Sequence, residues 1–202
     1  MVKLCVDLCS GLGGFSEAFV SAGWNVLRFD NDERFKDVPN TVIMDVCNIE
    51  AIKNVVASRK VNVVLASPPC ERFSFMGNPW PKAGIGKALT IVGACLELIV
   101  ALKPDYWILE NPKARLRWFI GKPKMTIRQI DYGGKYPKPT DLWGNISLPL
   151  LSKYRAPMKG HGPSARRRNG VLVIGNDSAE NSKIPYCLSQ TILECIETKA
   201  TM

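Results

Sequence analysis

The sequence has little that binds metal. It contains one histidine, His161, and no two of its seven cysteines are separated by a two-residue gap. Zinc ribbons and redox motifs use that gap, so we expect no metal site. Most of the cysteines are expected to be small buried residues of a reducing, cytoplasmic compartment. Cys70 is the exception, because of its neighbours in the sequence.

Long hydrophobic runs are also missing. The opening run, residues 4–6, is interrupted by Asp7 and is too short for a signal peptide. The longest apolar-rich stretch, residues 88–102, contains Gly93 and Glu97 and falls short of the ~20 residues that a membrane span needs. Repeats and low-complexity segments do not occur. We therefore expect a soluble protein that does not enter a membrane.

The chain does have the composition of a folded domain. It is 202 residues long and 46% hydrophobic, which is enough to bury the core of a single domain over residues 1–202. Its 27 Lys and Arg outnumber 18 Asp and Glu, which gives a net charge of +9. This surplus favours a polyanionic partner, although many basic proteins bind no nucleic acid.

Short β-branched runs alternate with amphipathic stretches through the first half of the chain. Strands are expected near 4–6, 25–29, 41–44, 61–66 and 105–109, with helices after the first, third and fourth. This alternation predicts an α/β fold with a doubly wound, mostly parallel sheet. After Pro112 the pattern loosens, and antiparallel pieces are expected around 124–132 and 170–174. A final helix is expected at 185–197, with Pro185 in its first turn.

Polar residues follow the expected strands at their carboxyl ends, where doubly wound sheets bind ligands. In chain order these are Asp7 with the glycine turn 11–14, Asp30, Asp45, residues 67–70 and residues 110–112. The glycine turn lets backbone approach a ligand closely. Asp30 follows it by about 20 residues, the separation at which an acid receives ribose hydroxyls. From these residues alone the cofactor is NAD, FAD or S-adenosylmethionine, and a turn without ligand also remains open.

Cys70 follows a rigid Pro-Pro segment and opens a loop that carries Arg72, Lys82 and Lys87. Nearby positive charge favours the thiolate, which is the nucleophilic form of cysteine. Glu110 is expected one strand away on the same edge of the sheet, so one substrate could touch both side chains. A thiolate beside a carboxylic acid suggests covalent addition assisted by protonation. A buried loop cysteine and a helix-capping acid are the structural alternatives.

Together these motifs resemble those of the cytosine-5 DNA methyltransferases, in the order that the family shows and with the size of a small viral or prophage-like member. The matching segments are DLCSGLGGF at 7–15, Asp30 with Asp32, DV at 45–46, SPPC at 67–70, ENP at 110–112, KPTDLW at 138–143 with Asn145, and NS at 181–182 with IPYCLSQ at 184–190. Cys9 stands where the family usually has Phe, and Pro112 where it has Val. The resemblance implies a Rossmann-like, S-adenosylmethionine-dependent methyltransferase fold.

The resemblance also implies roles for individual residues. Cys70 would add to C6 of a cytosine in DNA and Glu110 would bind or protonate N3, so that C5 can take the methyl group. Arg128 is the nearest candidate for an arginine that family members bring to the cytosine. The residues implied to hold S-adenosylmethionine are Gly11, Leu12, Gly14, Asp30, Asp45, Val46 and Asn181. The base must be flipped out of the stack, and residues 71–86 are expected to form a lid over it.

The region before the C-terminal motif is much shorter than the target-recognition domain of the usual family member. We expect residues 146–180 to form a short basic insert in its place. The residues expected to bind nucleic acid are Arg166, Arg167 and Arg168 in this insert and Arg72, Lys82 and Lys87 near Cys70. Such charges neutralise phosphates without reading sequence. A solvated basic loop is the alternative.

Two other functions remain open at this point. One keeps the chemistry and changes the substrate to RNA. The other is a protein of methyltransferase ancestry that binds cofactor or nucleic acid without catalysis, which the short recognition region favours. The intact pair of Cys70 and Glu110 argues against it, because binding alone needs neither. A homodimer or a separate subunit is a further possible source of target recognition.

Overall fold

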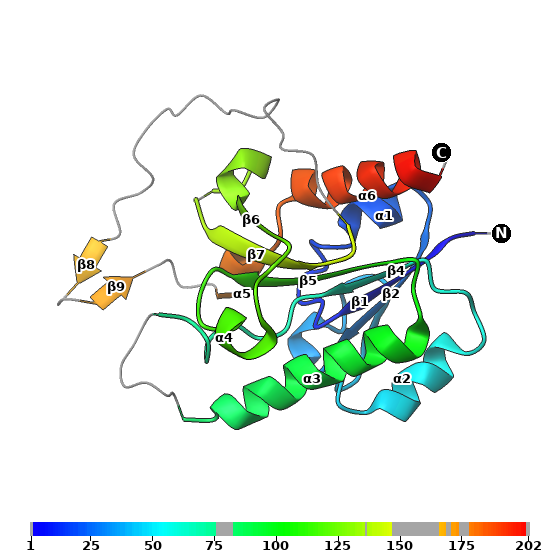
Figure 1. The fold of residues 1–202 in the computed structure, drawn as a ribbon, viewed down its shortest axis with the longest axis horizontal. Helices are drawn as coiled ribbons and strands as arrows, with labels where there is room; N and C mark the ends of the chain where they lie inside the picture. The colour runs from blue at the N-terminus through cyan, green and yellow to red at the C-terminus, as the bar shows by residue number, and fades with distance from the viewer. Residues whose placement is uncertain are drawn as a thin grey trace.

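The computed structural model of the chain describes residues 2–75, 83–135, 137–146, 166–168, 171–173 and 178–200 (Figure 1). Its strands are β1 (Leu4–Leu8), β2 (Asn25–Asp30), β3 (Thr41–Ile43), β4 (Val63–Ala66), β5 (Tyr106–Pro112), β6 (Met125–Arg128), β7 (Pro139–Gly144), β8 (Arg166–Arg168) and β9 (Val171–Val173). Its helices are α1 (Glu17–Ser21), α2 (Ile49–Val56), α3 (Ile85–Leu102), α4 (Arg117–Ile120), α5 (Ser178–Ser182) and α6 (Tyr186–Ala200), with 3-10 turns η1 (Glu33–Phe35) and η2 (Gln129–Tyr132). The strand and helix order confirms the expected α/β class.

Seven strands form one sheet in the order β3-β2-β1-β4-β5-β7-β6. The first five of these are parallel, and β7 runs antiparallel to both β5 and β6. The doubly wound, mostly parallel sheet is therefore confirmed, as are antiparallel strands after Pro112. The chain order reverses at β1, which lies between β2 and β4, and such switch points are where this kind of sheet binds ligands. Strands β8 and β9 form a separate hairpin.

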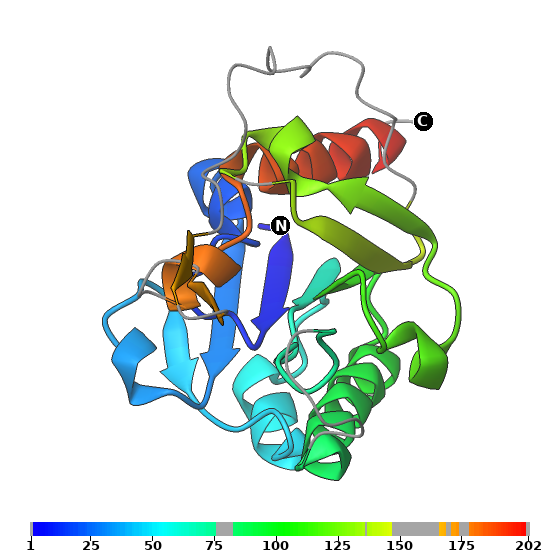
Figure 2. The same cartoon turned by 90° about the vertical axis from the view of Figure 1, so that its left-hand side faces the viewer.

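The sheet is covered on both faces (Figures 1 and 2). Helices α2 and α3 pack on one face and contribute to one core cluster, whereas α1 and α6 pack on the other and contribute to a second. The central strands β1 and β4 are buried along their whole length. Their nearly continuous apolar sequences suit strands that have a helix layer on each side.

Helix α3 is longer than the apolar stretch that the sequence indicated at residues 88–102. It is 18 residues long with a mean hydropathy of 2.0, and among the described helices it alone is long and apolar enough to cross a membrane. The expectation that this stretch falls short is therefore corrected. Core helices pass the same test, and α3 buries Val92, Cys95 and Leu98 against the sheet. Gly93 and Glu97 lie on its exposed side.

Two expected features fall partly outside the described residues. Of the expected lid at 71–86, residues 76–82 lie outside, and they include Lys82. Phe73, within the described part of this segment, is a fully buried core residue. Of the basic insert expected at 146–180, the structure describes Ile146, β8, β9 and the start of α5. The single-domain assignment stays a prediction.

Candidate functional site

The glycine turn after β1 is tied to the end of β2. Gly11 has a positive φ of 51°, and its backbone N–H donates to Oδ2 of Asp30 at 2.8 Å. The N–H of Ser10 donates to the carbonyl of Phe29 at 3.1 Å. Gly14 has no room for a side chain, because a Cβ there would lie 2.6 Å from the carbonyl oxygen of Ile184. The turn therefore lies against both β2 and the segment before α6.

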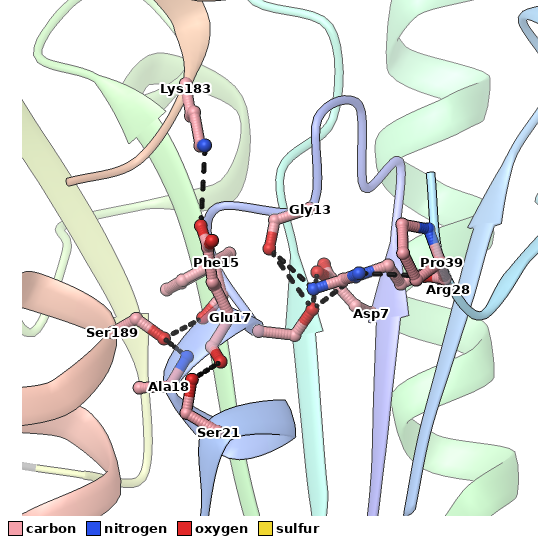
Figure 3. A network of polar contacts seen from close by, with 11 residues as sticks. Asp7, Gly13, Phe15, Glu17, Ala18, Ser21, Arg28, Pro39, Lys183 and Ser189 are labelled. Carbon is pink, nitrogen blue, oxygen red and sulfur yellow. Dashed lines mark hydrogen bonds and ion pairs between the residues drawn. The ribbon is translucent and has the colours of Figure 1, made fainter. Parts of the chain in front are cut away.

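A buried polar network supports this turn from beneath (Figure 3). The hydroxyl of Ser16 donates to Oδ2 of Asp7 at 2.6 Å and accepts from Nε of Arg28 at 2.9 Å. Nη2 of Arg28 donates to the carbonyl of Gly13 at 2.9 Å. Burial raises the pKa of Asp7 to about 6, although the hydrogen bond from Ser16 and the charge of Arg28 oppose the rise. Sequence reasoning assigned no role to Arg28, an arginine within an apolar strand.

The C-terminal segment returns to the same turn (Figure 3). The hydroxyl of Ser189 donates to the carbonyl of Phe15 at 2.7 Å and accepts from the N–H of Ala18 at 3.1 Å. Nζ of Lys183 lies 3.4 Å from Oε2 of Glu17. The C-terminal segment, which includes the family-like residues 184–190, therefore lies against this turn.

The ends of β4 and β5 are joined by a side-chain hydrogen bond. Nδ2 of Asn111 donates to the carbonyl of Pro68 at 2.9 Å. The carbonyl of Cys70, two residues on, accepts the N–H groups of Phe73 and Ser74, both at 3.0 Å. Glu110 precedes Asn111 on β5 and is 5% exposed. The Pro-Pro-Cys segment is thus held against the strand that carries Glu110.

One cavity of about 270 Å³ opens between these parts. Its lining includes the turn residues Gly11, Leu12 and Gly14, the strand-end residues Asp30, Cys70 and Glu110, and Ser182, Lys183 and Ile184 of the C-terminal segment. Asp45 and Val46 line a smaller hollow of about 50 Å³, which shares Cys9, Asp30 and Pro69 with the larger one. The structure therefore brings most of the sequence-predicted site residues together.

Three polar side chains on this cavity end in buried oxygens that have no hydrogen-bond partner among the described residues. They are the hydroxyls of Ser10 and Ser67 and Oε1 of Glu110. Buried polar atoms of folded proteins are nearly always paired, so each such atom needs an explanation. A polar ligand bound in the cavity would give these oxygens hydrogen-bond partners, and the lining residues suit a cofactor with hydroxyl and amino groups.

The surroundings of the cavity raise the pKa of both reactive side chains, Glu110 and Cys70. Burial raises the pKa of the Glu110 carboxyl above its usual value, with Lys138 opposing the rise and Asp141 adding to it. Burial also raises the pKa of the Cys70 thiol, the charge of Glu110 adds to that rise, and Lys138 again opposes it. Glu110 is thereby suited to donate a proton. Cys70 is not poised as a thiolate here, contrary to the expectation from its basic neighbours.

Lys138 is a site residue that sequence reasoning missed. It lines the cavity and its charge acts on both Cys70 and Glu110. Its backbone is fixed at the start of β7, where its carbonyl accepts the hydroxyl of Thr140 at 3.0 Å. The only signal in the sequence was its place at the head of the KPTDLW segment.

Arg128, predicted to reach the substrate base, lies elsewhere. Its side chain is 62% exposed and pairs with Asp131 at 2.7 Å, and it does not line the cavity. The assignment is corrected on geometry, because β6 is the far edge strand of the sheet. Arg72 and Lys87 are exposed and also lie outside the lining.

Four other predicted residues are placed by their backbone alone. Arg166, Arg167 and Arg168 form β8, and Asn181 lies in α5 beside the cavity-lining Ser182. Their side chains are outside the described part of the structure, as is the whole of Lys82. Their expected contacts stay predictions.

Comparison with known proteins adds to this geometry. The model of a family described as C-5 cytosine-specific DNA methylase matches residues 4–117. The type II methyltransferase M.HgiDI of Herpetosiphon aurantiacus is 29% identical over an alignment of 123 residues, and the match covers 55% of this chain and 38% of the relative. M.HindV of Haemophilus influenzae is 27% identical over an alignment of 114 residues, and the match covers 53% of this chain and 36% of the relative. The chain thus spans well under half of the length of these two relatives.

A solved structure shows a similar fold. A putative DNA modification methyltransferase encoded within an Escherichia coli prophage matches with a TM-score of 0.53 and 18% sequence identity. The match covers 73% of this chain and 49% of that chain. Together with the sheet order, it confirms the expected Rossmann-like methyltransferase fold.

Proposed function

The chain belongs to the C-5 cytosine-specific DNA methylase family, whose model matches residues 4–117, and from this membership we propose that it methylates C5 of cytosine in DNA. The methyl donor is S-adenosylmethionine, and the reaction passes through a covalent adduct with Cys70. One observation carries the proposal: Cys70, Glu110 and the glycine turn line the same cavity. Because M.HgiDI and M.HindV are much longer than this chain, the activity of the whole protein is part of the proposal.

The cavity has groups that suit each part of the cofactor. The Asp30 carboxylate faces it and accepts hydroxyl donors such as those of ribose. Asp45 and Val46, on the adjoining hollow, are proposed to hold the adenine. Gly11, Leu12 and Gly14 present backbone to the ligand, and Asn181 is proposed to reach its methionine end. When bound, S-adenosylmethionine supplies an electrophilic methyl group.

The two reactive side chains would then act on opposite sides of the cytosine ring system. C5 of cytosine is too weak a nucleophile to attack a methylsulfonium by itself. The Cys70 thiol would give its proton to water, and its sulfur would bond to C6 while the Glu110 carboxyl gives its proton to N3; the C5–C6 double bond is thereby replaced by a C4–C5 enamine. After C5 has taken the methyl group, water would remove the C5 proton, the sulfur–C6 bond would break with its electron pair returning to sulfur, and N3 would return its proton to Glu110. Burial raises the pKa of Glu110 above its usual value, which supports its role as the acid.

Lys138 is proposed to balance the charge during this sequence. Its positive charge lowers the pKa of the Cys70 thiol against the effect of burial. It would therefore stabilise the thiolate at the moment when the sulfur attacks.

DNA is the partner that membership of this family leads us to expect. The finer assignments are proposals: the phosphates would be bound by Arg72, Lys82 and Lys87 and by the basic strand Arg166–Arg168. The basic insert would replace a target-recognition domain. A homodimer, a separate recognition subunit and a cytoplasmic location remain predictions.

A mechanism-based trap tests the proposal. DNA that contains 5-fluorocytosine cannot lose its C5 substituent, so the methylated adduct should remain bonded to Cys70. We expect a stable protein–DNA band that requires S-adenosylmethionine and is lost in Cys70→Ala. Cys47→Ser is the matched control, because Cys47 is an exposed cysteine away from the cavity lining.

Labelled methyl donor, offered with DNA or RNA, decides between the remaining alternatives. Label in RNA alone would move the substrate to that polymer. If the cofactor binds and neither polymer gains label or forms the adduct, the chain is a binding protein of methyltransferase ancestry and the proposal is wrong.

A further inference from the structure

An exposed aromatic pair lies near the loop that begins at Cys70. The side chains of Phe75 and Trp118 are 58% and 61% exposed, and their ring centroids are 6.3 Å apart at 67°. The guanidinium carbon of Arg115 lies 4.7 Å from the centroid of Phe75 and 5.7 Å from that of Trp118. We call these three residues the aromatic–arginine platform.

The platform is connected to Cys70 by hydrogen bonds. The N–H of Arg115 donates to the carbonyl of Phe73 at 3.1 Å, and its Nη1 donates to the carbonyl of Ser74 at 2.7 Å. Phe73 and Ser74 in turn donate to the carbonyl of Cys70. Figures 1 and 2 show α4, which carries Trp118, at the edge where the parallel strands end. The platform is therefore continuous with the rim of the cavity.

The chain around the platform is strongly basic. Residues 111–130 contain six Lys and Arg and no Asp or Glu. Arg117 and Arg128 pair with acids from beyond this segment. Lys113, Lys122 and Lys124 are exposed. Exposed cations that lie close in the sequence to exposed aromatic side chains suit a polyanion that also carries flat rings, whereas an apolar protein surface would leave these cations desolvated.

We propose that the aromatic–arginine platform stacks against an unpaired base of a DNA strand, next to the cytosine that enters the cavity. Flipping a base leaves its neighbours with one face unstacked, and an aromatic side chain can cover that face. Stacking of this kind tolerates any base, since every base has a π-face. The choice of DNA as the polymer rests on the proposed function; the preference for unpaired bases rests on the platform itself.

The test uses binding without chemistry. The probe is a labelled oligodeoxythymidine strand, compared with a dA–dT duplex of the same length; neither contains cytosine, and no cofactor is added. We expect Trp118→Ala and Phe75→Ala each to weaken binding of the single strand by about 5- to 150-fold, because stacking contributes about 1–3 kcal/mol per base. The duplex should be affected several-fold less. Trp118→Phe keeps an aromatic face and should retain most of the affinity.

Val100→Ala is the matched control, because Val100 is 73% exposed on α3 and should leave binding unchanged. Thermal unfolding of each variant shows whether it folds. The proposal is overturned if folded Trp118→Ala binds the single strand as tightly as wild type, or if strand and duplex lose affinity equally. It is also overturned if the variant changes only the oligomeric state in gel filtration, which would make the platform a contact between copies.

A failure of the platform proposal can be distinguished from a failure of the proposed function. A normal 5-fluorocytosine adduct together with unchanged strand binding in Trp118→Ala would overturn the platform alone. Loss of strand binding in Trp118→Ala, with no adduct formed by wild type, would overturn the methylation mechanism alone.

Discussion

At the scale of single residues, Asp7 shows how burial sets a pH dependence. Its carboxyl group is fully buried under the glycine turn, and its pKa is raised from 3.8 to about 6. Between these two values the folded protein keeps a proton that the unfolded chain has lost. The contribution of Asp7 to stability is therefore present below the unfolded pKa and is lost as the pH rises through about 6.

Asp7→Asn should remove this dependence, because an amide keeps the shape and cannot ionise. We expect the variant to gain stability relative to wild type as the pH rises from about 4 to about 7, at up to about 1.4 kcal/mol per pH unit in the steepest part. Urea unfolding at several pH values measures it. Asp37→Asn, the same change on an exposed side chain, is the control. Parallel stability curves for wild type and Asp7→Asn would contradict the argument.

Lys138 should govern the reactivity of Cys70. Its charge lowers the pKa of the thiol, so Lys138→Gln should raise that pKa and slow alkylation by iodoacetamide at a given pH. Peptide mass spectrometry that follows Cys70 against pH should show the titration displaced to higher pH. Lys138→Arg should restore most of the reactivity, and Lys60→Gln, on an exposed lysine paired with Asp105, should change nothing. An unshifted profile in Lys138→Gln would remove Lys138 from the site.

Functional residues could be predicted from the sequence where they lie close after the apolar run of a strand. Cys70 and Glu110 come straight after apolar runs, so the parallel sheet alone places them on one edge. Lys138 and Arg28 could not be found in this way. Lys138 reaches the cavity from an antiparallel strand whose position depends on pairing far along the chain. Arg128 was misplaced because nothing local to β6 reveals that it is an edge strand.

At the scale of elements, α1 is capped from the other end of the chain. Ser16 stands at its N-cap but makes no capping bond, since its hydroxyl is occupied by Asp7 and Arg28. The N–H groups of a first helical turn have no partner within the helix. That of Ala18 is satisfied by Ser189 of α6. Nothing local to α1 indicates Ser189, because the two helices meet only in the folded chain.

Ser189→Ala should therefore destabilise the protein by about 1–3 kcal/mol, since it leaves the buried N–H of Ala18 without an acceptor. It should also weaken binding of S-adenosylmethionine, because Ser189 anchors the segment that closes over Gly14. Urea unfolding and calorimetric titration give the two quantities. Gln190→Ala, at the exposed neighbouring position of α6, is the control. Equal stability of Ser189→Ala and Gln190→Ala would mean that the bond contributes nothing.

At the scale of the whole molecule, the parallel strands could be predicted from the sequence. For the antiparallel strands, the sequence predicted that they occur but not their order in the sheet. Apolar runs such as β1 and β4 reveal buried parallel strands through local pattern alone. The insertion of β7 between β5 and β6 is a matter of pairing between distant segments. Periodicity carries no information about that order. The same limit explains why the cavity residues at the ends of parallel strands were predicted and Lys138, which precedes β7, was not.

The contact between α1 and α6 also has a consequence for how the molecule forms. Ser189 bonds to Ala18 and Phe15 across separations of 171 and 174 residues. Closing so long a loop costs chain entropy before any contact repays it, so pairings of this range are slow. Neighbouring strands such as β1 and β2 close far shorter loops. We therefore expect the wall of the pocket contributed by Lys183 and Ile184, just before α6, to form after the parallel strands have paired.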